Sequence, residues 1–381
     1  MTDRFRPARK GLLAAALAAA ACAGLLTAQP RRAQLESPTV LADGRIQFRV
    51  AAPDARTLRL QAPWAGGRLE FEQGEAGIWS LTVGPVPPAI YSYTLLLDGV
   101  RVLDPHNTAV KRWSGGNASL VEVPAPEPLP YDLRDVPHGS LHVHYYASEA
   151  GGPNRRLLVY APPGYYDEAD RRYPVLYLLH GSGDDETAWA EVGKANLILD
   201  NLIASGAAEP MLVVMPNGHP VPWARRRRGI GSDNTRRLRD DLIQGAMPLV
   251  ESLYRAKLGP SQTAVAGLSM GGGQSLYCAA TGLDRFSWVG AFSAAAPAPE
   301  SDAAQGLLAD PERANASLDL LWIAIGRDDF LLDRNEAFKS ALAKAGVDHT
   351  YRLTSGGHSW PVWRGYLADF VPLLFRAGGQ P

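Results

Sequence analysis

The stretch TAVAGLSMGGGQSLYCAA, residues 263–280, decides the fold of this chain. Its first part, TAVAGL, is an apolar run that predicts a buried strand, and MGGGQSLYCAA predicts the start of a helix. Residues 267–271, GLSMG, fit the pattern G-x-S-x-G. Three fixed positions in five say little by themselves, so the meaning of Ser269 depends on the strand before it and the helix after it.

The chain around this stretch alternates between buried strands and helices. Continuous apolar runs, typical of strands buried on both faces, occur at YPVLYLLHG, MLVVMPNG, WVGAFSAA and LLWIAIG. Apolar residues at helical spacing lie between them, in RRLRDDLIQGAMPLVESLY and in RNEAFKSALAKAG, which ends in a glycine cap. Two earlier runs, SLHVHYYA and RRLLVYAPP, predict a hairpin. The pattern predicts an α/β fold with a mainly parallel sheet covered by helices on both sides.

Ser269 is predicted to be a nucleophile because it lies in the sharp turn between a strand and a helix. Gly267 and Gly271 let the neighbouring backbone approach this turn without a Cβ clash. The serine Oγ then projects from the carboxyl edge of the sheet, where the helix N-terminus offers N–H groups to a developing oxyanion. The alternative is a serine that only shapes the turn.

A serine hydroxyl needs a base to take its proton, and in this fold a late histidine follows an acid in the chain. His358, in RLTSGGHSW, lies in a loop between a strand and the C-terminal helix, and a surface loop histidine is the alternative. The acid should follow the strand LLWIAIG, where Asp328, Asp329 and Asp333 stand. We expect Asp329 to orient the histidine, with Asp333 as the main rival.

The oxyanion needs a second donor beside the Met270 N–H. The residues Gly181-Ser182-Gly183 follow a buried strand and can turn a backbone N–H toward Ser269. We expect His180 to pack and to shape this loop. The acids at 184–186 predict a solvated loop and no metal site.

From about residue 138 to 375 the chain resembles the esterase D-like esterase family. This family includes the feruloyl and acetylxylan esterases of carbohydrate esterase family 1 and the enterochelin esterases. The likeness rests on VYAPPGY, YPVLYLLHGSGDDETAW, VVMPNG, AVAGLSMGGGQSL, IAIGRDD and SGGHSWPVWRGYL.

This resemblance implies an α/β-hydrolase fold, no metal or other cofactor, and a serine triad. The family's motifs fall on Ser269, Asp329 and His358, with backbone donors at Met270 and Ser182, which favours Asp329 over its rival. Ser182 departs from the apolar residue that relatives often carry, a change that a backbone donor tolerates.

Residues 33–123 have a different pattern from the rest of the chain. Short runs of alternating character, separated by Gly, Pro or Asp-Gly, predict an all-β sandwich. FRVAAPDARTLRL, GIWSLTV and YSYTLLLDGVRVLDP resemble the early-set immunoglobulin-like modules that precede some feruloyl esterases. The proline-rich PAPEPLPYD, residues 124–132, predicts a semi-rigid linker to an esterase domain at 133–378.

The N-terminus has the layout of a secretory signal peptide, residues 1–28. Basic residues precede the apolar run GLLAAALAAAACAGLL, which is short for a membrane span of about 20 residues. We expect a periplasmic or secreted protein with no stable membrane insertion after signal removal. The alternatives are an uncleaved anchor and a lipoprotein attached through Cys22. Only Cys278 would remain after cleavage, so no intramolecular disulfide is expected.

The charge of the chain excludes some partners. The formal net charge of the 381 residues is −1, so the chain as a whole has no positive potential that would attract nucleic acid. The run Arg225–Arg228 predicts either a solvated loop or a rim that attracts anionic substrates. Gly181, Trp223 and Trp360 are the candidate substrate-binding residues, although core packing is an equal alternative for the two tryptophans.

The sequence as a whole favours a secreted serine ester hydrolase. The first hypothesis is a carbohydrate esterase that releases ferulate or a related acyl group from acylated plant polysaccharide or oligosaccharide. The second is a periplasmic siderophore esterase of the enterochelin type. From another class, an inactive glycan-binding scaffold remains open.

Overall fold

The computed structural model describes residues 35–221 and 231–376. The predicted signal peptide, Trp223 and Arg225–Arg228 lie outside the described residues. Within the described ranges, none of the helices is both long enough and apolar enough to span a bilayer.

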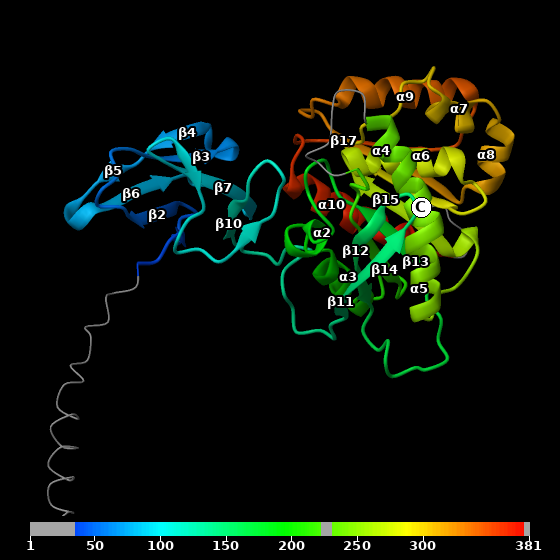
Figure 1. The fold of residues 1–381 in the computed structure, drawn as a ribbon, viewed down its shortest axis with the longest axis horizontal. Coiled ribbons are helices and arrows are strands. Elements are labelled where there is room, and N and C mark those ends of the chain that lie inside the picture. The colour runs from blue at the N-terminus through cyan, green and yellow to red at the C-terminus, as the bar shows by residue number, and fades with distance from the viewer. Residues whose placement is uncertain (1–34, 222–230, 377–381) are drawn as a thin grey trace, which may run out of the picture.

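Two antiparallel sheets form the N-terminal region, seen at the left of Figure 1. One has the strand order β1-β2-β6-β5, and the other has the order β4-β3-β7-β10-β9 with β8 paired to β7. Alternate residues of β2 are buried, as the period-two pattern predicts. The bounds are β1 Thr39–Val40, β2 Ile46–Ala51, β3 Leu58–Ala62, β4 Gly67–Glu70, β5 Glu72–Gln73, β6 Ile78–Val83, β7 Ala89–Leu97, β8 Val100–Val102, β9 Val110–Lys111 and β10 Ala118–Val123.

A sheet of eight strands forms the centre of the second region, with the order β11-β12-β14-β13-β15-β16-β17-β18. The first three strands pair antiparallel, which confirms the predicted hairpin, and the remaining pairs are parallel. The bounds are β11 Ser140–Ser148, β12 Gly152–Ala161, β13 Val175–Leu179, β14 Leu212–Pro216, β15 Thr263–Leu268, β16 Trp288–Phe292, β17 Leu320–Gly326 and β18 Thr350–Thr354.

Helices cover both faces of this sheet, as the buried strands predict (Figure 1). In β13, Val175, Tyr177 and Leu179 face one apolar core, and Leu176 and Leu178 face the other. The first core contains side chains of α4 Gly231–Asp241, α5 Met247–Leu253, α6 Met270–Thr281, α7 Asp302–Leu308, α8 Pro311–Ser317 and α9 Leu332–Ala345. The second contains side chains of α2 Ala188–Glu191, α3 Ala195–Ala204 and α10 Trp360–Phe370.

The segment between β14 and β15 differs from the single helix that its periodicity predicts. A π turn, η5 Leu242–Ala246, separates α4 from α5. Pro248 has no N–H to donate one turn back, so a regular α-helix cannot continue through it. A Cβ at Gly245 would lie 2.9 Å from atoms of Tyr146 and Ser148, so the turn also passes close to β11.

Arg364 connects the N-terminal sheets to the second region. This side chain on α10 is 1% exposed, and its guanidinium donates to the carbonyls of Val192 and Ile90 at 3.0 and 3.3 Å. It also lies over the ring of Tyr131, near the end of the proline-rich stretch. Burial lowers the pKa of Arg364 to about 10, because the interface shields the charge from water. The end of the proline-rich stretch, at Tyr131, is therefore packed against α10.

Candidate active site

The turn at Ser269 joins β15 directly to α6. Ser269 has φ 54° and ψ −114°, a backbone conformation that residues other than glycine rarely adopt. A Cβ at Gly267 would lie 2.6 Å from the backbone of Gly271, and one at Gly271 would lie 2.5 Å from the Leu179 carbonyl oxygen. Both glycines of the motif are therefore required by the close approach of the backbone.

The structure brings Ser269, His358 and Asp329 together at the carboxyl edge of the sheet. The Ser269 Oγ lies 2.9 Å from His358 Nε2. The two carboxylate oxygens of Asp329 lie 2.9 and 3.0 Å from His358 Nδ1. Ser269 follows β15, Asp329 follows β17 and His358 follows β18, so loops after three parallel strands of one sheet supply the three side chains.

A backbone N–H, in addition to His358, holds the carboxylate of Asp329 in place. Its residue is 4% exposed, and its Oδ1 accepts the Leu331 N–H at 2.9 Å. Burial by itself raises the pKa of Asp329, but the hydrogen bonds from His358 and Leu331 outweigh it, so the pKa lies below its ordinary value. The ionised Asp329 accepts a hydrogen bond from the Nδ1–H of His358, which leaves the Nε2 lone pair facing the serine. Asp333, the rival acid, lies in the first turn of α9 instead.

The loop after β13 lies directly against the serine. A Cβ built at Gly181 would be 3.7 Å from the Ser269 Cβ. Within the part of the chain that the structure describes, no hydrogen-bond partner is seen for the Ser182 N–H. Met270, the other predicted donor, is the first residue of α6.

The buried ring of His180 holds this loop by hydrogen bonds, as the sequence predicts. The ring is 1% exposed, its Nδ1 donates to the Gly181 carbonyl at 2.8 Å, and its Nε2 accepts the Gly218 N–H at 2.7 Å. These two bonds require the neutral ring, and burial lowers the pKa of His180 below its ordinary value.

Aromatic side chains surround His358. Its ring makes an edge contact with Trp363 at 4.9 Å between centroids and lies 4.5 Å from the exposed ring of Phe330. Trp360, a candidate substrate-binding residue, is 7% exposed and packs on Trp189 and Trp363. It is thus largely a core residue.

A cavity of about 760 Å³ opens beside His358, between the N-terminal sheets and α10. Trp360 lines it from the second region, and Trp64 and Tyr91 line it from the N-terminal region. The Trp64 indole donates to the Ser92 carbonyl at 2.8 Å, and its ring lies 5.0 Å from that of Tyr91. Sequence reasoning did not place these residues near the triad, because only the docking of the two regions brings them there.

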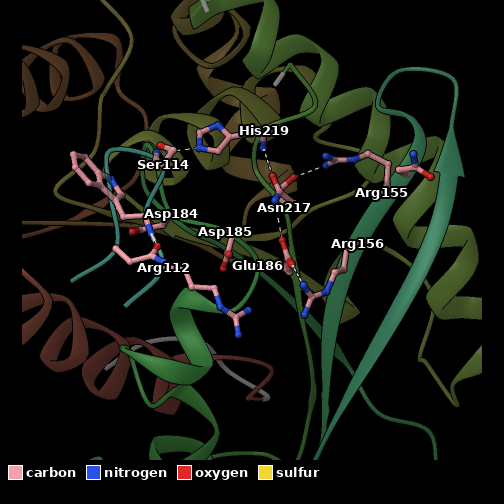
Figure 2. A pocket seen from close by; sticks show the side chains of 13 residues that line it. Arg112, Ser114, Arg155, Arg156, Asp184, Asp185, Glu186, Asn217 and His219 are labelled. Atoms are coloured by element: carbon pink, nitrogen blue, oxygen red, sulfur yellow. Dashed lines mark hydrogen bonds and ion pairs between the residues drawn. The ribbon is translucent and has the colours of Figure 1, made fainter. Parts of the chain in front are cut away.

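A second cavity, of about 500 Å³, is lined by residues 183–186 of the loop after β13, and Figure 2 shows the polar side chains along it. Asn217 is at its centre, donating to Glu186 at 2.8 Å and accepting the His219 N–H at 2.9 Å. Glu186 also pairs with Arg156 at 3.0 Å. The His219 Nε2 accepts the Gly183 N–H at 3.0 Å, so this network is connected to the loop beside Ser269.

Among residues 35–221 and 231–376, no group of three His, Cys, Asp or Glu side chains is arranged to hold a metal ion. The acids at 184–186 point to different partners: Asp184 pairs with Lys111, Asp185 accepts from Thr187, and Glu186 pairs with Arg156.

Comparisons with known proteins agree on one family. Residues 148–374 match the family described as "Putative esterase". An endo-1,4-beta-xylanase/feruloyl esterase from Xylanibacter ruminicola is 31% identical over 351 residues, which are 90% of this chain and 46% of the relative. The chain thus spans less than half the length of this curated relative.

Solved structures share the fold. A ferulic acid esterase is 29% identical with a TM-score of 0.54, over 62% of this chain and 97% of its own. The ferric enterobactin esterase of Salmonella typhimurium is 18% identical with a TM-score of 0.60, over 88% of this chain and 95% of its own. Because the matched family spans more than half of the residues, the chain belongs to the esterase family that carries the description "Putative esterase".

Proposed function

We propose that this chain is a serine-dependent carboxylic ester hydrolase. The observation that carries the proposal is the hydrogen-bonded series from Ser269 Oγ through His358 to a buried Asp329, in a chain of the esterase family. Ser269 is the nucleophile, His358 the general base and acid, and Asp329 the residue that orients the imidazole.

In the first half of the reaction, the Ser269 oxygen attacks the ester carbonyl carbon as its proton moves to His358 Nε2. The carbonyl electron pair moves onto its oxygen, and the resulting oxyanion accepts hydrogen bonds from the Met270 and Ser182 N–H groups. The intermediate collapses, the bond to the alcohol oxygen breaks, and His358 returns its proton to that oxygen.

In the second half, water replaces the alcohol. His358 takes a proton from the water, whose oxygen attacks the acyl carbon of the acyl-enzyme. The second tetrahedral intermediate uses the same two N–H donors, and its collapse releases the acid and restores the Ser269 hydroxyl. Asp329 stays ionised throughout and stabilises the imidazolium that forms twice in the cycle, in keeping with its lowered pKa.

The substrate we propose is an acylated plant polysaccharide or oligosaccharide bearing feruloyl or acetyl groups. The support is the relative from Xylanibacter ruminicola, whose name joins a xylanase to a feruloyl esterase. Gly181, Trp223 and Trp360 are the substrate-binding residues proposed, and the cavity that Trp360 lines beside His358 supports its assignment.

We further propose the domain organisation and location that the sequence indicates. Residues 33–123 form an immunoglobulin-like sandwich, a proposal that the two antiparallel sheets support. Residues 124–132 are the linker and 133–378 the esterase domain, whose order of parallel strands is consistent with an α/β-hydrolase. The protein is exported with the signal peptide at residues 1–28.

The test compares how fast the purified mature protein hydrolyses three substrates. We expect hydrolysis of methyl ferulate or acetylated xylan, and loss of that hydrolysis in Ser269→Ala. Ferric enterochelin is the third substrate, because the alternative is a siderophore esterase, which the likeness to the Salmonella typhimurium enzyme supports at the level of fold alone. Dominant turnover of the siderophore would contradict the carbohydrate assignment, and no turnover of any ester would contradict the hydrolase.

A further inference from the structure

The hairpin of β9 and β10 reaches from the N-terminal sheets to the loop beside Ser269. Its tip, residues 111–114, contacts the oxyanion loop, which we define as residues 181–184. The Ser114 N–H donates to the Gly183 carbonyl at 2.8 Å, and the Trp113 indole N–H donates to the Ser182 carbonyl at 3.2 Å. Figure 2 labels Ser114 of the tip and Asp184 of the loop among the side chains that line the cavity of about 500 Å³. Two successive carbonyls of the loop are therefore held by the other region of the chain.

An ion pair fastens the same two segments. The Lys111 Nζ lies 2.9 Å from Asp184 Oδ1, and the two side chains are 17% and 5% exposed. Removing one partner of a buried pair leaves the other charge shielded from water without compensation, which is costly. Lys111 also lies 5.7 Å from the ring centre of Trp360, so it joins the loop to the aromatic cluster beside His358.

The fit between hairpin tip and loop is close. Gly183 has φ +86°, and a Cβ there would lie 2.3 Å from the Trp113 indole nitrogen. A side chain at this position would therefore force the two segments apart. The contact between the hairpin tip and the oxyanion loop therefore fits one arrangement of the loop.

These contacts fix the peptide that carries the Ser182 N–H. On the side of the catalytic sheet, the carbonyl of Gly181 accepts from His180 and from the Asp184 N–H. On the other side, the carbonyl of Ser182 is held by the hairpin tip. The Ser182 N–H itself makes no hydrogen bond to any residue that the structure describes, so it is available to a ligand.

We propose that the hairpin tip is a positioning element for the oxyanion donor, so that the N-terminal sheets take part in catalysis. Lys111 and Trp113 are the positioning residues. This inference rests on the proposed function, because it assigns the Ser182 N–H to a developing oxyanion. Preorganised donors stabilise charge that exists only in the transition state, so loosening them lowers kcat more than it changes KM.

The central variant is Lys111→Met, and its matched control is Arg112→Met. Arg112 is the next residue of the same hairpin, but it pairs with the half-exposed Glu191 at 3.6 Å and, among the described residues, makes no hydrogen bond or ion pair with the oxyanion loop. With 4-nitrophenyl acetate, we expect Lys111→Met to lower kcat about tenfold or more while KM changes less than about threefold, since a full oxyanion donor is worth about 10²–10³ in kcat. Arg112→Met keeps kcat within about twofold, because exposed ion pairs contribute little.

Two further variants separate positioning from folding. Lys111→Arg restores the charge and is expected to recover most of kcat. Trp113→Phe keeps the aromatic ring and the ion pair but removes the indole donor, and we expect a fall in kcat of about threefold at unchanged melting temperature, in line with one weak neutral hydrogen bond. A trifluoromethyl ketone, which adds Ser269 to form an oxyanion, loses affinity in parallel with the fall in kcat/KM.

The outcomes are separable. Equal kcat in Lys111→Met and Arg112→Met overturns the inference while leaving the proposed function intact. If Lys111→Met fails to fold, Trp113→Phe decides: unchanged kcat overturns the inference and a lowered kcat supports it. If the wild type shows no hydrolysis that depends on Ser269, the proposed function fails, and the inference fails with it.

Discussion

Two histidines of this chain each hold a buried aspartate through Nδ1, and they differ in what faces Nε2. The first pair is His358 with Asp329, at 2.9 Å, and its Nε2 faces the Ser269 hydroxyl. The second is His138 with Asp200, at 2.8 Å, and its Nε2 lies 3.1 Å from the Arg134 carbonyl oxygen. The carboxylate–imidazole unit is the same in both places.

The difference lies in whether the group that faces Nε2 can donate a hydrogen bond. A carbonyl oxygen only accepts, so His138 must carry a proton on both ring nitrogens to make its two bonds. The hydrogen bond with Asp200 raises the pKa of His138 above its ordinary value, in agreement with a charged ring. A hydroxyl can donate, so His358 can present a lone pair to Ser269. The pair beside the hydroxyl is suited to proton transfer, and the pair beside the carbonyl is suited to holding structure.

The largest expected effect separates the two histidines. His358→Ala should lower kcat for ester hydrolysis by about 10⁶-fold, as should Ser269→Ala, because the members of a triad act as one unit. His138→Ala should leave kcat within about threefold, since its ring contacts no reacting atom. Steady-state kinetics on 4-nitrophenyl acetate measure both. A loss of similar size in His138→Ala would contradict the comparison.

The next effect separates the two aspartates. Asp329→Asn should lower kcat by about 10⁴-fold at neutral pH, because an amide cannot hold the imidazole in the required tautomer. Asp200→Asn should leave kcat unchanged and lower the free energy of unfolding by about 1–3 kcal/mol, because Asp200 also accepts hydrogen bonds from Gly139 and Tyr160. Kinetics and urea unfolding of both variants check this. Equal kinetic losses would refute the assignment of roles.

A smaller effect appears in the pH dependence of stability. The pKa of His138 is raised in the folded chain, whereas in the unfolded chain it has its ordinary value of 6.5. The contribution of this histidine is therefore complete below pH 6.5 and is lost as pH rises through the raised pKa. The melting temperature of the wild type should exceed that of His138→Ala in acid, with the gap closing as pH rises. A gap that widens with pH would mean that His138 is neutral in the folded state.

The smallest expected effect tests the rival acid. Asp333 lies at the start of α9 and has no hydrogen bond to His358. Asp333→Asn should therefore keep kcat within about twofold, as distant surface changes do. The same assay with Asp329→Asn provides the reference. A fall comparable to that reference would reassign the orienting acid.

Much of the fold follows from local patterns in the sequence. The continuous apolar runs at 175–179 and 320–326 predict buried parallel strands because each residue type there suits a strand covered on both faces. The apolar spacing of residues 236–254 predicts a helix without the π turn at Leu242–Ala246. The periodicity of the apolar residues is hardly changed by one wide turn, so the pattern could not reveal it.

The candidate site divides in the same way. Ser269, Asp329 and His358 could be predicted as candidates because each follows a strand at a position that chain order specifies. The ion pair between Lys111 and Asp184 could not, because the two residues lie in different regions and only the docking of the sheets joins them. Lys111 stands in no motif of the sequence, so no local signal marks it as the partner of Asp184.

The most direct test of the account is to find which residue a fluorophosphonate labels. This reagent forms a covalent bond with an activated serine oxygen, and mass spectrometry of the digested protein locates the adduct. We predict a single adduct on Ser269, lost in Ser269→Ala and formed much more slowly in His358→Ala but not in His138→Ala. An adduct on another serine, or equal labelling of wild type and Ser269→Ala, would contradict it.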